Sequence, residues 1–491
     1  MSSPVQFLTD FSDRLSPMLV KELRQGMRAR SFTMLFLIFQ GTLALILLTA
    51  GSISEMDGAG AIASGIIFTM FSIAVLFIQP MRGVNALSSE ITGNTIEMMS
   101  LTRLSAWRIV FGKWIAIVSQ SALILTTIIP YLILRYFFGG MMLLGELVFL
   151  ALIFLTSMAL TAVMVGFSAT TTKLARGLPI IGVVMLVNLV PSYLFRGRFG
   201  SGMSFFALAD WDSRISVFCY VAFITYFGWC ALSHGTSAIA PVAENHSTIR
   251  RLIAFGLAMI TAAAGFHEDF DPELIAVFLA VIMAPAVITA LTERAIVLPP
   301  VCKPFLKRGL SGRVAAAFLL PGWPTGVFYT CMMAGIGVAG IAIASYSKSP
   351  AGVGDEFTII CLSCFGSVLL PALLAAVFSK QDNKRFTNFV LFLVLSIIVT
   401  IGATMLVEMK NHEDLLWFFI WNPPVFIRML AGSHFNQDTL VMAATVVDFL
   451  ILALLLVTAA MGYRDYQRVF QETEEGLARD NKPADSPPSG S

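Results

Sequence analysis

An acidic residue stands in the middle of an apolar run near the carboxyl end of the sequence. Asp448 lies within residues 439–462, a segment otherwise long and apolar enough to cross a membrane. An ionised carboxylate is costly at that depth, so a residue of this kind is a candidate functional group. It can line a substrate pathway, pair with a polar residue of another apolar run such as Asn188, or stay protonated between helices.

Other residues with metal-binding or redox chemistry are sparse. The tripeptide His-Glu-Asp occurs at 267–269 and again at 412–414, and Cys361 and Cys364 are about one helical turn apart. Three consecutive residues do not converge on one ion unaided, so we interpret both tripeptides as polar loops. We interpret the two cysteines, which have no histidine near them in the sequence, as packing residues. The sequence therefore predicts no catalytic residue and no metal site.

The composition indicates which elements must position these groups. Of the 491 residues, 57% are hydrophobic and only 13% are charged, whereas an ordinary soluble domain is about 25% charged. This excludes a water-soluble enzyme. The net charge of +2 gives no reason to expect a nucleic-acid partner. We therefore expect an all-α, polytopic membrane protein that is a bundle of helices.

About twelve apolar runs have the length of a membrane span. They lie near 32–52, 60–80, 109–138, 143–168, 177–195, 215–239, 252–266, 274–291, 325–345, 357–379, 387–408 and 439–462. Most of the 32 Lys and Arg residues then fall on the side shared by the two termini. By the positive-inside rule, both termini are cytoplasmic, as in a bacterial-type inner (plasma) membrane protein.

The runs predict four parts of the chain. A polar amino-terminal segment, 1–31, precedes a six-helix bundle over 32–247 that includes a cytoplasmic loop at 81–113. A second six-helix bundle covers 248–462. Residues 463–491 lose apolar periodicity and end in NKPADSPPSGS, a composition that cannot bury enough surface to fold, so we expect a disordered cytoplasmic tail.

A short amphipathic helix is predicted just before the first span. Pro17 suits its first position, where a missing N–H costs nothing. Its two faces differ in character: Val20, Leu23 and Met27 form the apolar one, and Lys21, Arg24 and Arg28 form the cationic one, with Glu22 between them. Such a helix lies in the headgroup layer with its cations toward anionic lipid. A basic flank that only orients the protein is the plainer alternative.

The loop between the second and third spans contains signals for a second short helix. Gly93 and Asn94 tolerate a left-handed turn, Thr95 can cap a helix, and Glu97 falls in its first turn. Residues 96–101 then form a short helix, and Ser105 caps the next helix, which enters the membrane. A well-capped helix on a cytoplasmic loop suits contact with a partner. The plainer alternative is an interfacial connector.

Residues 90–113 resemble the loop signature of permease subunits of type-2 ABC transporters, in which acidic residues, a Gly-Thr pair, an apolar stretch, a Thr-Pro-Leu-Ser turn and a Gly-Lys pair recur in order. The residues that carry the resemblance are Glu90, Thr95, Glu97, Thr102, Leu104, Ser105, Gly112 and Lys113. Residues 17–30 are similar to the amphipathic elbow helix of the same family. Two positions depart from the pattern, since Asn94 replaces the usual Gly and Arg103 replaces the usual Pro.

The resemblance implies an exporter permease whose loop docks a cytoplasmic ATPase. The elements it implies are a coupling loop with Glu90, Asn94, Thr95, Glu97, Thr102, Arg103, Ser105 and Lys113, and an elbow helix with Pro17, Lys21, Glu22, Arg24 and Arg28. No G-x-x-x-x-G-K-[ST] phosphate loop occurs in this sequence, so ATP and Mg²⁺ belong to a separate subunit and this chain carries no cofactor. ATP binding would then rock the bundles between inward and outward states.

The second half leaves several alternatives open. Its loop at 292–323 lacks the acidic and Gly-Thr pattern, so the half is either a diverged duplicate or an accessory bundle in a complex with two copies of the chain. The aromatic stretch 415–426, which contains Asn422, Pro423 and Pro424, suits an interfacial or re-entrant segment on the outer side. The rival functions are an ion-coupled secondary transporter and a non-transporting scaffold or regulatory subunit that docks an ATPase.

Overall fold

The computed structural model describes residues 17–52, 59–93, 105–136, 142–170, 177, 206, 208–241, 244–267, 272–348, 354–379, 384–410, 412–432 and 435–480. All regular secondary structure within these ranges is helical. The chain forms two compact units, unit 1 over Met1–Ala240 and unit 2 over Pro241–Ser491. Unit 2 thus begins close to residue 248, where the second bundle was expected.

Ten helices in the described part of the chain are long and apolar enough to cross a membrane. In unit 1 they are α2 (Arg30–Ser52), α7 (Ala106–Tyr136), α8 (Leu143–Phe167) and α10 (Trp211–Ile239). In unit 2 they are α11 (Ser247–Ala264), α12 (Pro272–Thr292), α15 (Trp323–Lys348), α16 (Asp355–Phe378), α17 (Arg385–Lys410) and α19 (Gln437–Asp480). Each coincides with an apolar run expected from the sequence, so the chain is a polytopic helical membrane protein.

Two of the twelve expected spans are not among these ten. The run 60–80 forms α3 (Ala59–Ser72), a π-helical turn η2 (Ile73–Ile78) and α4 (Gln79–Met81) in succession. The wider π turn changes the backbone pairing, and Ser157 of α8 donates a 2.6 Å hydrogen bond to the carbonyl of Val75 within it. The run 177–195 falls almost wholly outside the described residues.

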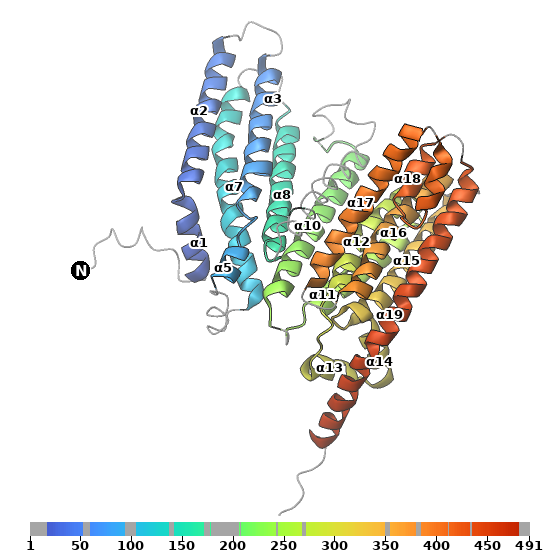
Figure 1. Cartoon of the computed structure of the whole chain (residues 1–491). Helices are drawn as coiled ribbons and strands as arrows, with labels where there is room; N and C mark the ends of the chain where they lie inside the picture. Colours follow the sequence, from blue (N-terminus) through green and yellow to red (C-terminus); the bar gives the residue numbers. More distant parts are fainter. Residues whose placement is uncertain are drawn as a thin grey trace, which may run out of the picture. The chain divides into compact units, whose positions relative to one another are not determined.

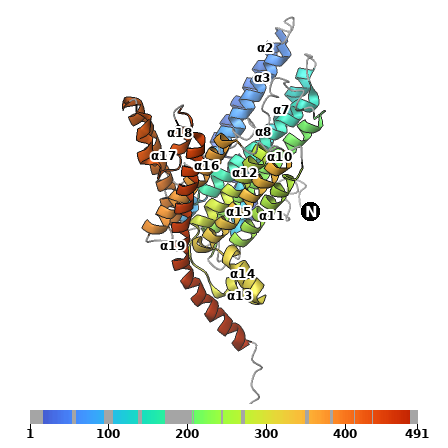
Figure 2. The same ribbon diagram turned by 90° about the vertical axis from the view of Figure 1, so that its right-hand side faces the viewer.

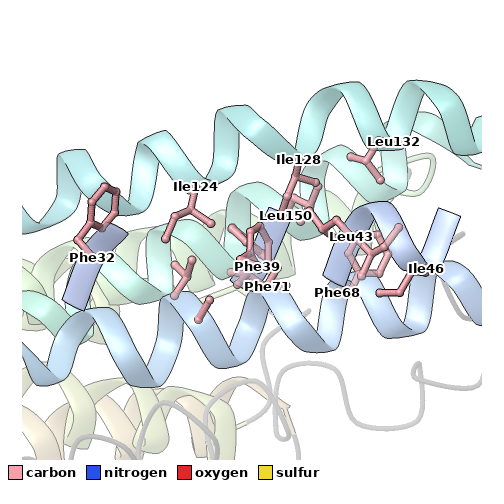
Figure 3. Close-up of a cluster of buried hydrophobic side chains, with 14 residues drawn as sticks. Phe32, Phe39, Leu43, Ile46, Phe68, Phe71, Ile124, Ile128, Leu132 and Leu150 are labelled. Atoms are coloured by element: carbon pink, nitrogen blue, oxygen red, sulfur yellow. The ribbon is translucent and has the colours of Figure 1, made fainter. Parts of the chain in front are cut away.

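The core of unit 1 lies where α2, α3, α7 and α8 meet (Figure 1). Figure 3 shows Phe39 and Leu43 of α2 pointing toward Phe71 of α3 and Ile128 of α7. The other faces of α2 carry exposed apolar side chains such as Leu48. A helix that is apolar on all sides suits a lipid environment, which explains why so little of α2 is covered by protein.

Helices α8 and α10 of unit 1 approach each other very closely at glycines. A Cβ added to Gly166 would lie 2.7 Å from the carbonyl carbon of Ala231, and one added to Gly235 would lie 2.8 Å from the Cα of Gly166. Small residues allow backbones in a membrane to pack this tightly. Two short helices complete the described part of unit 1, α1 (Pro17–Met27) before α2 and α5 (Ser88–Thr92) after α4.

Unit 2 is built on two closely packed helix pairs, α12 with α15 and α16 with α19. Between α16 and α19, a hairpin made of η5 (Glu413–Phe419) and α18 (Val425–Leu430) packs inward. We call residues 412–432 the re-entrant segment. Leu416, Phe426 and Met429 are buried in it, whereas Phe418 and Trp421 are exposed. The hairpin lies in the stretch for which the sequence predicts an interfacial or re-entrant segment, and its position relative to the membrane stays a prediction.

The expected disordered tail is wrong for residues 463–480. Helix α19 runs unbroken for 44 residues to Asp480, and Figure 2 shows α13 (Pro299–Leu306) and α14 (Gly309–Leu319) beside its lower half. Val469, Phe470 and Leu477 of α19 pack against buried residues of α13 and α14. This apolar contact supplies the burial that the composition of the tail alone did not suggest.

Candidate functional site

Three residues singled out from the sequence meet in unit 1. Lys113 of α7 lies with its Nζ 2.7 Å from Oε1 of Glu90 on α5 and 3.3 Å from Oε1 of Glu22 on α1. We call these three residues the elbow–loop junction. The side chain of Lys113 is only 8% exposed, and those of Glu90 and Glu22 are 16% and 20% exposed. One shielded ammonium thus connects the amino-terminal helix, the loop and the third span.

A second basic residue reinforces the same contact. Arg82, just after α4, donates hydrogen bonds to the side-chain oxygen of Gln120 on α7 and to the carbonyl of Gly26 on α1, the latter at 3.5 Å. Gly26 faces the amide of Gln120 so closely that a Cβ there would overlap it. The guanidinium of Arg82 also lies 5.9 Å from the ring centroid of Phe32. Helix α1 is therefore held to α7 by two separate contacts, the ion pair of Glu22 with Lys113 and the hydrogen bonds of Arg82.

Helix α1 begins at Pro17 as predicted, but its apolar face is shorter than expected because Met27 is exposed. Lys21, Arg24 and Arg28 are exposed, whereas Val20 and Leu23 are half-buried. The buried side of α1 contacts α7, and Glu22 belongs to that side. The helix thus carries its three cations on exposed positions, where anionic headgroups can reach them, while the carboxylate of Glu22 fixes it to the bundle.

The loop itself is only partly described. Glu90 lies within α5, whose Leu87 is fully buried and donates its backbone N–H to Ser168 Oγ at 3.0 Å. Gly93 has a φ of −82°, so the left-handed turn expected there is absent at this residue. Ser105 stands immediately before α7 as predicted, and its carbonyl accepts the N–H of Arg108 at 3.0 Å. The predicted residues Asn94, Thr95, Glu97, Thr102 and Arg103 lie outside the described residues.

Asp448, the other candidate site, lies on α19 and is 6% exposed. Its Oδ1 lies against Gly366 of α16, where an added Cβ would overlap it, and the Cβ and Cγ of Pro423 would lie 2.7 Å from the same Cβ. Its Oδ2 is buried without a hydrogen-bond partner. Asn188, the suggested partner of Asp448, lies outside the described residues.

The tip of the re-entrant segment is held by a polar residue next to Pro423. Asn422 is fully buried, and its amide donates to the carbonyl of Ser396 at 2.9 Å and to Oγ1 of Thr400 at 3.0 Å. Ser396 Oγ donates back to the side-chain oxygen of Asn422. These bonds satisfy the amide within an apolar bundle and fix the tip to α17.

Sequence analysis missed a buried charge cluster in unit 2. Arg250 and Arg251 begin α11 and are almost fully buried, and both pair with Glu293, with Arg251 Nη2 2.7 Å from its Oε2. Burial alone would raise the pKa of Glu293, but the two arginines and hydrogen bonds from Ser247 and the Gly322 N–H hold it below its ordinary value. The Arg-Arg pair at a helix start and the Glu just after a span were the available signals.

The cluster also fixes a loop of unusual shape. Arg251 donates to the carbonyls of Leu320 at 2.7 Å and Gly322 at 3.0 Å. Gly322 has a φ of +118°, a conformation that favours glycine, and a Cβ there would overlap the hydroxyl of Tyr466 on α19. The cluster thus secures the junction between α14 and α15, and we assign it a structural role.

The described residues contain no group of three His, Cys, Asp or Glu side chains placed to hold a metal ion. Cys361 and Cys364 are both free thiols on α16. The elbow–loop junction is an ion-paired contact that holds α1, α5 and α7 together. Asp448 is a buried carboxyl next to Pro423 of the re-entrant segment. Comparisons with protein-family models, with curated proteins and with solved structures find no match to this chain.

Proposed function

We propose that this chain is the membrane-spanning permease subunit of an ABC transporter, and that a separate ATPase docks on the loop following α5. The observation that carries the proposal is the elbow–loop junction. The two segments that resemble the permease family, residues 17–30 and 90–113, are far apart in the sequence. Glu22, Glu90 and Lys113 belong to these segments and form one ion-paired group.

A joint of this kind suits force transmission. An ATPase that pushes on a loop moves the bundle only if the loop is fastened to the spans. Lys113 sits on the second turn of α7, so a displacement of Glu90 is passed directly to a helix of 31 residues. Because the three side chains are largely shielded from water, their attraction is screened less than that of a surface pair. In this mechanism α1, α5 and α7 move together.

The cationic face of α1 supports the same assignment. Lys21, Arg24 and Arg28 are exposed on a helix that immediately precedes a span. Cations in this position bind the anionic headgroups of a cytoplasmic leaflet. The side of the membrane that holds the loop is then the side where ATP is available. Substrate would cross through the helices by alternating access, with ATP and Mg²⁺ bound to the partner.

The proposal is tested by producing the chain together with candidate phosphate-loop ABC ATPases. We expect one of them to co-purify with the chain in lipid nanodiscs, and its ATPase rate to respond to the permease. The double variant Glu90→Ala, Glu97→Ala should lose the partner while inserting normally, because losing Glu90 releases α5 from Lys113 and losing Glu97 removes the other acidic residue of the loop. Wild-type association of the double variant would refute docking at this loop.

Asp465→Ala provides the control, since this carboxylate is 80% exposed on α19 and belongs to unit 2 rather than to the loop. It should retain full association. Vesicles containing the complex then distinguish a transporter from a non-transporting docking subunit. ATP-dependent movement of solute or lipid across the bilayer supports the permease, whereas docking without any movement favours the scaffold.

A further inference from the structure

We propose that Asp448 is a proton-binding site in unit 2, and that its protonated form seats the tip of the re-entrant segment. The inference concerns unit 2 alone and stands whether or not an ATPase docks on unit 1. It rests on a 6% exposed carboxyl, an oxygen with no hydrogen-bond partner, and the chemistry of its surroundings.

Gly366 and Pro423, which lie against this carboxyl, offer no hydrogen for it to accept. Gly366, which faces Oδ1, lies inside α16, where backbone N–H groups are used by the helix. The tip of the re-entrant segment presents Pro423, followed by Pro424, and proline has no N–H. A carboxylate in this position would lack the donors that stabilise buried anions, whereas a neutral carboxylic acid has no charge to compensate.

A second buried polar side chain without a hydrogen-bond partner lies on α16, the helix that faces the acid. Ser363 of α16 is fully buried, and its Oγ has no hydrogen-bond partner in the structure. It precedes Gly366 by three residues, about one helical turn, so both lie on one side of α16. Asp448 and Ser363 are thus two buried polar side chains without hydrogen-bond partners, on helices that pack together. This arrangement indicates a site whose hydrogen bonds change when a proton binds or leaves.

A proton fits this site better than a metal cation. Hard cations such as Ca²⁺ take about six to eight oxygen ligands. The atoms that crowd Gly366 beside the carboxylate oxygen are the ring carbons Cβ and Cγ of Pro423. A proton needs no ligand other than the carboxylate itself. On release, the acid O–H bond breaks, its electron pair remains on the oxygen, and the proton passes to water.

Other titratable groups do not neutralise Asp448. On the described side chains of the helices packed against α19, they are Asp355, Glu356, Cys361 and Cys364 of α16, Arg428 of α18, Tyr329, Cys331 and Tyr346 of α15, and Cys302 and Lys303 of α13. The acidic pair starts α16, about 15 Å of helix from Gly366, and the thiols are neutral near pH 7. No ion pair joins Asp448 to a described side chain.

The test uses dicyclohexylcarbodiimide, an apolar reagent that modifies protonated carboxyls within membranes. The full chain in nanodiscs is labelled across a range of pH, and adducts are mapped by mass spectrometry. We expect an adduct at Asp448 that declines about tenfold per pH unit above its midpoint. Asp448→Asn should abolish it, and Glu408→Gln, which removes an exposed carboxylate near the end of α17, should leave it unchanged.

Hydrogen exchange over residues 412–432 supplies the second readout. Exchange is expressed relative to the intrinsic rate of each amide at the same pH. We expect this relative exchange in the wild type to rise as Asp448 loses its proton, and in Asp448→Asn to stay slow at every pH because the side-chain amide is always neutral. The assignment is overturned if no adduct forms at any pH, or if adduct and exchange are both independent of pH. Protection of Asp448 by sodium or potassium at fixed pH would also overturn it, because a metal cation would then be the ligand.

Discussion

Replacing Lys113 by Met should loosen α1 and α5 together. The substitution keeps the apolar stem of the side chain and removes the ammonium that both glutamates share. At an effective dielectric constant of about 20, the two contacts at 2.7 and 3.3 Å correspond to roughly 6 and 5 kcal/mol of gross attraction. Desolvation of the charges offsets most of this attraction.

The net cost follows from the exposure of the partners. Removing one partner of a fully buried pair costs about 3 to 5 kcal/mol, mostly because the other charge stays buried. Glu22 and Glu90 are 20% and 16% exposed, so both can turn partly toward water. We therefore expect Lys113→Met to cost about 2 to 3 kcal/mol. That corresponds to about 30- to 150-fold faster hydrogen exchange of the amides of α1 and α5.

Single replacements of the glutamates separate the two contacts. Glu22→Gln should speed exchange in α1 and leave α5 close to wild type, because Glu90 keeps Lys113. Glu90→Gln should have the opposite effect. Lys21→Met is the matched control, since Lys21 is exposed on the same helix as Glu22. The reasoning is refuted if Lys113→Met changes exchange less than about twofold, or if each glutamate variant loosens both helices equally.

Three further substitutions test unit 2 and the glycine contact of unit 1. Gly366→Ala should lower the free energy of unfolding by about 1 to 3 kcal/mol, seen as a lower unfolding temperature, because its Cβ would displace the re-entrant tip. Gly402→Ala is the control and should have little effect, because the space around Gly402 is open. Gly166→Ala should also destabilise the protein in thermal unfolding, since the new Cβ would overlap the backbone carbonyl of Ala231 on α10. If either variant melts at the same temperature as Gly402→Ala, the packing is contradicted. The stability due to Glu293, whose pKa is depressed, is present above its ordinary pKa and lost as pH falls through the folded value. Glu293→Gln should therefore flatten the acid side of a plot of unfolding temperature against pH, and an unchanged slope would show that its ion pairs contribute nothing.

The spans were predictable because each is an apolar run of membrane length. The ten candidate helices coincide with ten expected runs, including α19 around Asp448. The π turn over Ile73–Ile78 within the second run was not foreseen, and its Val75 carbonyl accepts a hydrogen bond from Ser157 of another helix. Local sequence does not contain that partner.

Charges were harder to place than apolar residues. Glu22, Glu90 and Lys113 were each selected from motifs, but their meeting was not predicted, because the first and last are separated by 91 positions. The helix over 463–480 was not predicted because the polar composition of the whole tail was given more weight than the spacing of its few apolar residues. Tyr466, Phe470, Thr473 and Leu477 recur at three- or four-residue intervals, which is the helical signal that could have found it.

The unbroken length of α19 has a mechanical consequence. At 1.5 Å per residue, its 44 residues span about 66 Å, and Phe470 lies about 33 Å along the rod from Asp448. A tilt of about 5° about the level of Asp448 would carry Phe470, and the α13–α14 hairpin resting on it, sideways by about 3 Å. A small change in tilt where α19 packs against the re-entrant tip is therefore amplified into a larger displacement of the α13–α14 hairpin.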